Sequence, residues 1–148
     1  MSIYQGTFYI RSALSQRKPV DLEASNPNGR LIEYTYHGGA NQQWRLSHIQ
    51  NGEFSIQNVA TGTYATAQNG NNTVIRAANT NPQTNSAARW TIVRANAAND
   101  TWYIKSVGYN GKTFDVAGSS QADVTEILAY QYHGGVNQQF TLQRVGGC

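Results

Sequence analysis

The segment Tyr34–Trp44 reads YTYHGGANQQW, and the segment Tyr130–Phe140 reads YQYHGGVNQQF. Eight of these eleven positions are identical, which chance does not supply in one short chain. Self-similarity of this kind indicates a chain built from repeated structural units. We therefore expect the residues before and after the two segments to repeat as well.

Three runs that alternate apolar with polar residues open three such units, at residues 7–11, 53–57 and 101–105. Period-two alternation is typical of a half-buried β-strand. The central isoleucines lie 46 and 48 residues apart: Ile10, Ile56 and Ile104. Each unit ends in another apolar alternation, around Trp44, Trp90 or Phe140, which we expect in the core. The pattern predicts an all-β chain of about four strands per unit, closed into a pseudo-threefold barrel.

The composition fits one folded β domain with an uncharged polar surface. Asn and Gln number 28 among 148 residues, whereas only 13% of the residues are charged and 11% are aromatic. Disorder requires few aromatics, so the chain is expected to fold. No apolar stretch approaches 18 residues, so we expect no membrane insertion.

The net charge of +3 is spread along the chain, and Arg17 and Lys18 are the only adjacent basic residues. Nucleic-acid binding requires a clustered basic stripe, so we expect no nucleic-acid partner. The single cysteine, Cys148, allows no internal disulfide and no cysteine-based zinc cluster. The residues Gly146–Cys148 are interpreted either as an added tail or as a natural end. The first residues lack the basic and apolar pattern of a secretory signal, which predicts a cytoplasmic protein or release by a non-classical route.

The endings Gln42-Gln43-Trp44 and Gln138-Gln139-Phe140, with their His-Gly-Gly-x-Asn lead and three repeats of about 47 residues, resemble the ricin-B-type β-trefoil lectins. The small fruiting-body lectins of mushrooms are the most similar subgroup. The resemblance implies a single β-trefoil domain over residues 1–148, with repeats at about 6–50, 51–97 and 98–145 and a tail at 146–148. It also implies carbohydrate binding without catalysis.

An ionised Asp accepts hydrogen bonds from vicinal sugar hydroxyls, and an Asn amide both donates and accepts. By resemblance, Asp21 with Asn41 forms one sugar site and Asp115 with Asn137 forms another. We expect the neighbouring glutamines to support these sites, by direct contact or by fixing the Asp: Gln42 and Gln138.

The same stretches offer aromatic and glycine residues to each site. His37 or Tyr36 is the candidate platform in the first repeat, and His133 or Tyr132 in the third. Gly39 and Gly135 follow another glycine, and they either form a turn or let backbone N–H groups approach the ligand. Tyr34 and Tyr130, two residues before Tyr36 and Tyr132, are expected on the same strand face as packing residues.

The second repeat departs from the pattern at each polar position. Ala65 stands for the Asp, Gln83 for the His, Ala87 for the Asn and Ala88 for the Gln, whereas Trp90 keeps the core residue. We therefore predict two sites, in the first and third repeats.

These patterns predict a non-catalytic lectin for terminal galactose or N-acetylgalactosamine, whose partners are the glycans of glycoproteins or glycolipids. The alternative is a β-trefoil protease inhibitor that acts through exposed loops. We expect no cofactor, metal or catalytic residue, because no hydrolase elbow, phosphate loop or metal motif occurs. The sequence leaves a homodimer open.

Overall fold

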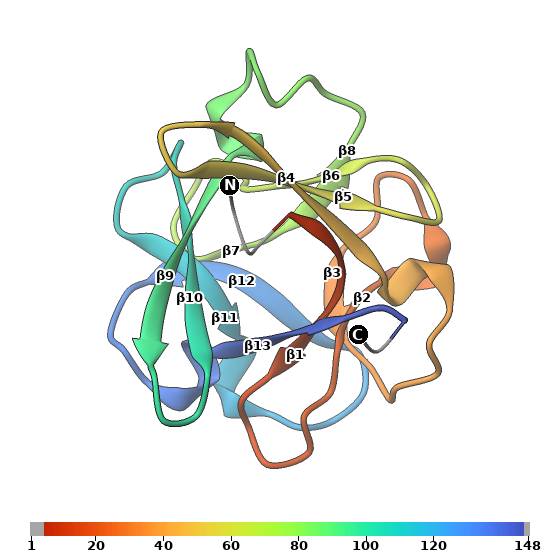
Figure 1. The fold of residues 1–148 in the computed structure, drawn as a ribbon, viewed down its shortest axis with the longest axis vertical. Coiled ribbons are helices and arrows are strands. Elements are labelled where there is room, and N and C mark those ends of the chain that lie inside the picture. The colour runs from red at the N-terminus through yellow and green to blue at the C-terminus, as the bar shows by residue number, and fades with distance from the viewer. Residues whose placement is uncertain (1–4, 147–148) are drawn as a thin grey trace.

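The computed structural model describes residues 5–146, which form thirteen β-strands and five single 3-10 turns (Figure 1). The strands are β1 (Gly6–Ser12), β2 (Val20–Leu22), β3 (Leu31–Glu33), β4 (Trp44–Gln50), β5 (Glu53–Asn58), β6 (Tyr64–Thr66), β7 (Thr73–Val74), β8 (Arg76–Ala78), β9 (Trp90–Asn96), β10 (Thr101–Ser106), β11 (Lys112–Val116), β12 (Thr125–Gln131) and β13 (Phe140–Arg144). The 3-10 turns are η1 (Glu23–Ser25), η2 (Ala40–Gln42), η3 (Ser86–Ala88), η4 (Ala117–Ser119) and η5 (Val136–Gln138). The described residues leave out Met1–Tyr4 at the start of the chain and Gly147 and Cys148 at its end.

Six antiparallel strands close into a ring, in the order β1, β4, β5, β9, β10 and β13, with β13 pairing back to β1. Three further hairpins are formed by β2 with β3, β6 with β8, and β11 with β12. In Figure 1 the hairpin strands β2, β3, β11 and β12 lie toward the middle of the view, and connecting loops project around the edge. This architecture is a β-trefoil, which confirms the predicted all-β fold class.

The core is built from the residues that end each alternating unit. Trp44, Trp90 and Phe140 are fully buried, as the sequence predicts, and so are the three central isoleucines of the opening strands. The Trp44 indole donates a hydrogen bond to the Val20 carbonyl at 2.9 Å, and Trp90 donates equivalently to Ala65 at 3.0 Å. Each indole therefore fixes the neighbouring hairpin strand from inside the core.

Each of two hairpins is also held by a loop from another lobe. The Thr35 backbone N–H donates to Asp123 Oδ1 at 2.8 Å, and the Gln131 N–H donates to Asn72 Oδ1 at 3.1 Å. The loop before β12 thus packs on the first lobe, and the loop before β7 packs on the third. The lobes are therefore mutually dependent, as expected for repeats that share one core.

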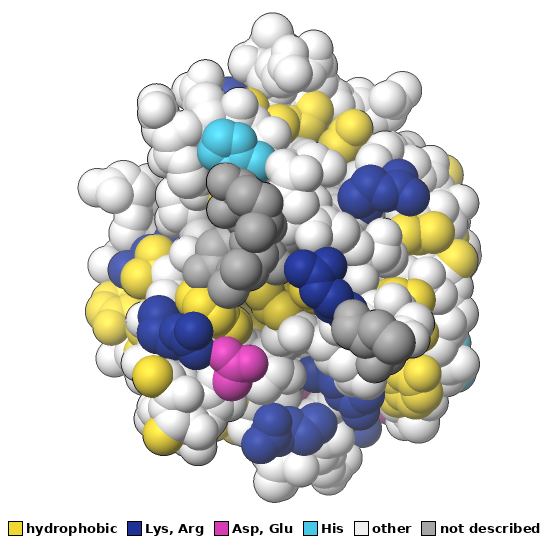
Figure 2. All heavy atoms as spheres, in the orientation of Figure 1, with side chains coloured by type: hydrophobic (Ala, Val, Ile, Leu, Met, Phe, Trp, Pro, Cys, Tyr) yellow, Lys and Arg dark blue, Asp and Glu magenta, His cyan; other side chains and the backbone are white. Residues whose placement is uncertain are grey.

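Basic side chains on the face drawn in Figure 2 lie in several separate groups, with uncharged and hydrophobic surface between them. Within residues 5–146, the structure contains no helix long and apolar enough to cross a membrane.

Candidate functional site

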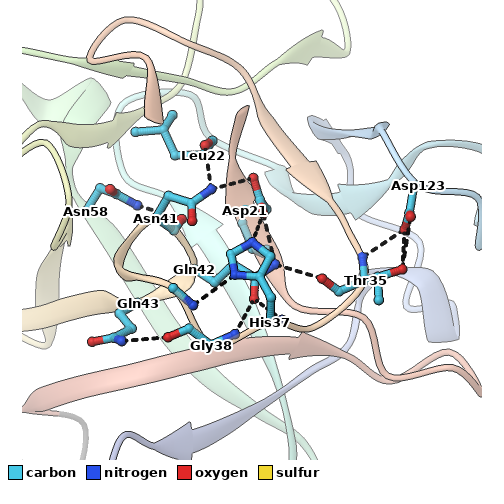
Figure 3. A network of polar contacts seen from close by, with 12 residues as sticks. Asp21, Leu22, Thr35, His37, Gly38, Asn41, Gln42, Gln43, Asn58 and Asp123 are labelled. Atoms are coloured by element: carbon cyan, nitrogen blue, oxygen red, sulfur yellow. Dashed lines mark hydrogen bonds and ion pairs between the residues drawn. The ribbon is translucent and has the colours of Figure 1, made fainter. Parts of the chain in front are cut away.

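Asp21 is the central polar residue of the first lobe, where it lies in the short buried strand β2 and is only 3% exposed. A buried carboxylate requires hydrogen-bond partners. Asn41 Nδ2 donates to Asp21 Oδ1 at 3.1 Å, and Gln42 Nε2 donates to Asp21 Oδ2 at 2.9 Å (Figure 3). Both amides come from the turn η2, so the strand and the turn are joined through one side chain. The three residues that the sequence placed in the first site are therefore brought together.

Gln42 uses both ends of its amide inside the protein. Its Nε2 also donates to the Thr35 carbonyl at 3.0 Å, and its Oε1 accepts from the backbone N–H groups of His37 and Gly38. The residue is fully buried. Of the two roles that the sequence leaves open for Gln42, this geometry is that of fixing Asp21 and the adjoining loop.

His37 stands at the opening of the site, with 46% of its side chain exposed. Its Nδ1 accepts from the Gly39 N–H at 2.9 Å, so the neutral ring carries its proton on Nε2. Nε2 lies 3.6 Å from Asp21 Oδ2, and both residues line one cavity. A Cβ on Gly39 would lie 2.8 Å from His37 Cε1, so glycine at this position sets the orientation of the imidazole.

A cavity of about 280 Å³ opens over this cluster. It is lined by polar and apolar groups together: Asp21, Glu23, Ala24, Ile32, Tyr34, His37, Asn41 and Val124. Asn41 Oδ1 makes no hydrogen bond within residues 5–146, which leaves an acceptor at the cavity wall. The cavity combines fixed polar groups with an apolar surface, as sites for small molecules do.

Tyr34 and Val124 are two lining residues that the sequence analysis missed. The prediction that Tyr34 is a packing residue was wrong, because the side chain is 38% exposed and lies edge-on to His37, with ring centroids 6.3 Å apart. Residues 34–39 do not form a strand, so Tyr34 and Tyr36 do not share a strand face. Tyr36 packs against Tyr9 instead, with centroids 5.2 Å apart, and it does not line the cavity.

The carboxyl groups at the cavity differ in their electrostatic surroundings. Burial raises the pKa of Asp21 above its ordinary value, although the hydrogen bond from Gln42 opposes this rise. Glu23 pairs with Arg30 through two contacts of 2.7 and 2.8 Å, and these hydrogen bonds lower the pKa of Glu23. Asp21 therefore depends on neutral donors to remain ionised, whereas Glu23 is held by a cation.

The third lobe repeats the arrangement almost bond for bond. Asn137 Nδ2 and Gln138 Nε2 donate to the two oxygens of Asp115 at 3.2 and 2.9 Å. His133 Nδ1 accepts from the Gly135 N–H at 3.0 Å, and its Nε2 lies 3.5 Å from Asp115 Oδ2. Burial raises the pKa of Asp115 as well. Gln138 is fully buried, like Gln42 in the first lobe.

Tyr130 and Tyr132 make contacts equivalent to those of Tyr34 and Tyr36 in the first lobe. Tyr130 lies edge-on to His133 at a centroid distance of 6.0 Å, whereas Tyr132 packs edge-on to Tyr103 at 5.1 Å. The prediction of a shared strand face fails here too, because Tyr132 lies beyond the end of β12.

The second lobe lacks the constellation, but one predicted correspondence was wrong by one residue. The indole of Trp90 bonds to the Ala65 carbonyl as Trp44 bonds to that of Val20, so Thr66, and not Ala65, occupies the position of Asp21. In a strand of two or three residues, the alternation of apolar and polar residues is too short to show which residue faces which side. Threonine has no carboxylate, and the Thr66 hydroxyl donates to the Tyr64 carbonyl at 2.8 Å. The second lobe therefore lacks the acidic group under either correspondence.

Strand pairing shows which loop residues of the first and third lobes are equivalent. Thr125 pairs with Glu33 in the first lobe, and Thr73 pairs with Ala129 in the third. The preceding residues, Val124 and Asn72, are therefore equivalent, and both have a positive φ. Val124 lines the cavity of the first lobe, whereas the Asn72 side chain accepts hydrogen bonds from the Gln131 N–H and the Lys112 ammonium.

Glu33 is a buried carboxyl behind the wall of the first site. It is 1% exposed, and its Oε2 has no hydrogen-bond partner in the described part of the chain. Burial raises the pKa of Glu33 to about 7, against opposing effects of the Thr125 hydroxyl and the Lys18 ammonium. The Glu33 carbonyl accepts from the Val124 N–H at 3.0 Å, which joins this residue to the cavity wall. Across residues 5–146, no group of three His, Cys, Asp or Glu side chains could hold a metal ion.

A model of the family described as ricin-type β-trefoil lectin domain-like matches residues 40–130 of the chain. The match covers more than half of the sequence, so the chain belongs to this family, as the resemblance implied. No curated protein matches the chain by sequence.

Solved structures with the same fold include the agglutinin of Rhizoctonia solani, at 27% identity and a TM-score of 0.81, with 96% of each chain covered. The C-terminal half of an earthworm R-type lectin, in complex with GalNAc, is 25% identical, with a TM-score of 0.70 and coverage of 93% of this chain and 97% of that one. A Macrolepiota procera ricin B-like lectin, in complex with lactose, is 22% identical, with a TM-score of 0.79 and coverage of 97% and 99%.

Proposed function

We propose that the chain is a non-catalytic lectin that binds terminal galactose or N-acetylgalactosamine through one site in the first repeat and one in the third. The observation that carries the proposal is the duplicated constellation around Asp21 and Asp115. In both lobes a buried carboxylate is fixed by an Asn and a Gln amide and lies 3.5–3.6 Å from a His Nε2. Duplication of a constellation with this cost of burial favours a binding role in both lobes.

The chemistry of the first site suits a sugar with two adjacent hydroxyls. Two amide donors engage the Asp21 carboxylate, which still has lone pairs for further hydrogen bonds. Asn41 Oδ1 can accept a hydrogen bond from a sugar hydroxyl, and the edge of Tyr34 supplies apolar surface for the ring. The GalNAc complex of the earthworm relative supports the choice of sugar.

A calorimetric titration with lactose tests the proposal. The wild-type chain is expected to bind two molecules, each single variant, Asp21→Ala or Asp115→Ala, to bind one, and the double variant to bind none. Thr66→Ala is the matched control, because Thr66 occupies the equivalent strand position in the second lobe. Folding of each variant is verified by the far-ultraviolet circular dichroism spectrum and thermal midpoint.

Retention of both sites in a folded double variant would show that these carboxylates do not hold the sugar. A glycan array on the same samples distinguishes galactosides from other glycans. Binding confined to glycans without galactose or N-acetylgalactosamine would refute the proposed specificity.

A further inference from the structure

A second cavity, of about 330 Å³, lies against the strands of the second and third lobes. It shares no lining residue with the cavity over Asp21 and includes none of the residues around Asp115. The side chains that matter here are Glu53, Thr91, Lys105, Ser106, Asn110 and Tyr132. Its volume falls at the lower end of the range for small-molecule sites, about 300–1,000 Å³.

Lys105 is the cation in this cavity, and within the described residues its contacts are with aromatic rings and not with hydrogen-bond acceptors. The residue is half-buried in β10, and its ammonium lies over the ring of Tyr132, 4.2 Å from the centroid. Between residues 5 and 146 the ammonium makes no hydrogen bond and no ion pair. The ammonium is not among the buried unpartnered atoms of the described residues, so its three N–H donors are open to a ligand in the cavity. The cavity thus presents a positive charge that the protein itself does not neutralise.

The equivalent positions in the other two lobes are satisfied internally. Strand register aligns Lys105 with Arg11 and Gln57, because these residues pair with Thr113, Pro19 and Tyr64 in turn. Arg11 donates to the Arg17 carbonyl at 2.8 Å and to Gln143 at 3.1 Å. Gln57 donates to the Gly62 carbonyl at 2.9 Å. Within residues 5–146, Lys105 therefore differs from its two counterparts in making no hydrogen bond with its side chain.

The single acidic group of the cavity already has a cation of its own. Glu53 Oε1 accepts from Arg89 Nε at 2.9 Å, and both side chains are mostly buried. With Glu53 paired to Arg89, the charge of Lys105 remains in excess. The other carboxylate oxygen of Glu53 and the side chains of Asn110 and Thr91 offer neutral or charge-assisted partners for hydroxyl groups.

We propose that this cavity binds an acidic monosaccharide unit, with its carboxylate on the Lys105 ammonium and its ring hydroxyls on Glu53, Thr91 and Asn110. The carboxylate supplies the counter-charge that Lys105 lacks, and a sugar ring supplies the mixture of donors and acceptors that the opposite wall requires. The exposed ring of Tyr132 offers an apolar border for the ring carbons. This site goes beyond the proposed galactoside sites and contains none of the residues that contact Asp21 or Asp115.

Amide chemical shifts in a titration with methyl β-glucuronide test the proposal, and methyl β-glucoside serves as the neutral counterpart that lacks only the carboxylate. The glucuronide is expected to shift the amides of Ser106 and Asn110 and to bind at least about tenfold more tightly than the glucoside, because the contact is charge-assisted. Lys105→Gln is expected to remove this difference. Glutamine is compatible with the strand, since Gln57 occupies the equivalent position.

Arg11→Gln is the matched control, and it is expected to leave glucuronide binding unchanged. Lactose binding by the Lys105→Gln variant should equal that of the wild type, so failure at this cavity is distinguishable from failure of the galactoside sites. Equal binding of glucuronide and glucoside, or unchanged glucuronide binding by Lys105→Gln, would overturn the proposal. N-acetylaspartate binding as tightly as the glucuronide would overturn the assignment to a sugar.

Discussion

Glu33 provides a quantitative test of the electrostatics next to the first site. In the folded chain its pKa is about 7, against the usual 4.5, because the carboxyl is buried and its Oε2 has no hydrogen-bond partner in the described residues. Between these two values the folded state holds a proton that the unfolded state has released. Stability from this group is therefore complete below pH 4.5 and is lost as the pH rises to about 7.

The size of this loss follows from the two pKa values. Each unit corresponds to about 1.4 kcal/mol, so ionisation of Glu33 costs the fold roughly 3 kcal/mol by pH 8. The nearby charges limit this cost only partly, because the Lys18 ammonium lies 2.9 Å from Asp123 and is already paired. The Asp123 carboxylate itself raises the pKa of Glu33 further.

Glu33→Gln replaces the carboxyl with an uncharged group of the same shape. Urea unfolding at pH 4.5 and pH 8 should show the variant close to the wild type at the lower pH and about 2–3 kcal/mol more stable at the higher one. Asp100→Asn is the control for an exposed carboxylate, with 74% of its side chain accessible, and it should show no such growth with pH. A Glu33→Gln effect that is constant with pH would refute the argument that Glu33 is protonated in the folded chain.

Three further predictions concern the core and the sites. Trp44→Ala should lower the free energy of unfolding by about 3–5 kcal/mol, measured in urea, because the buried indole fills the core; a loss below 1 kcal/mol would contradict this packing. Gly39→Ala should displace the His37 ring and weaken lactose binding at the first site by fivefold or more in calorimetry, with the third site as the internal reference. Tyr34→Ala should weaken lactose binding at the first site with little change in thermal midpoint, because the ring is exposed at the cavity; a large fall in the midpoint would instead restore the packing role.

Local pattern was sufficient for the parts of the fold that repeat along the chain. The Asn and Gln residues could be located because the whole His-Gly-Gly-x-Asn-Gln-Gln segment recurs, whereas the two Asp residues came from the family resemblance. The structure places each Asp against its own Asn and Gln. The buried Trp residues followed from strand alternation for the same reason. Physical constraints that act within one repeat are thus visible in sequence.

Features that depend on contacts between repeats were not predictable in this way. Val124 reaches the first cavity from a loop more than eighty residues away from Asn41 along the chain, and no local pattern marks that approach. Tyr34 was predicted to lie in a strand, because the alternation of residues does not reveal that the backbone leaves the sheet after Glu33. The offset at Thr66 arose because two adjacent registers of a three-residue strand look alike.

The cavity of the first lobe is lined by residues from two distant parts of the chain. Asp21 and Asn41 belong to the first third of the chain, whereas Val124 belongs to the last. Substitutions in the last third of the chain can therefore change the shape of the first cavity while Asp21 and Asn41 stay the same. The first repeat on its own would contain Asp21 and Asn41 but would lack Val124. The shape of the first cavity therefore depends on two repeats together, the first and the third.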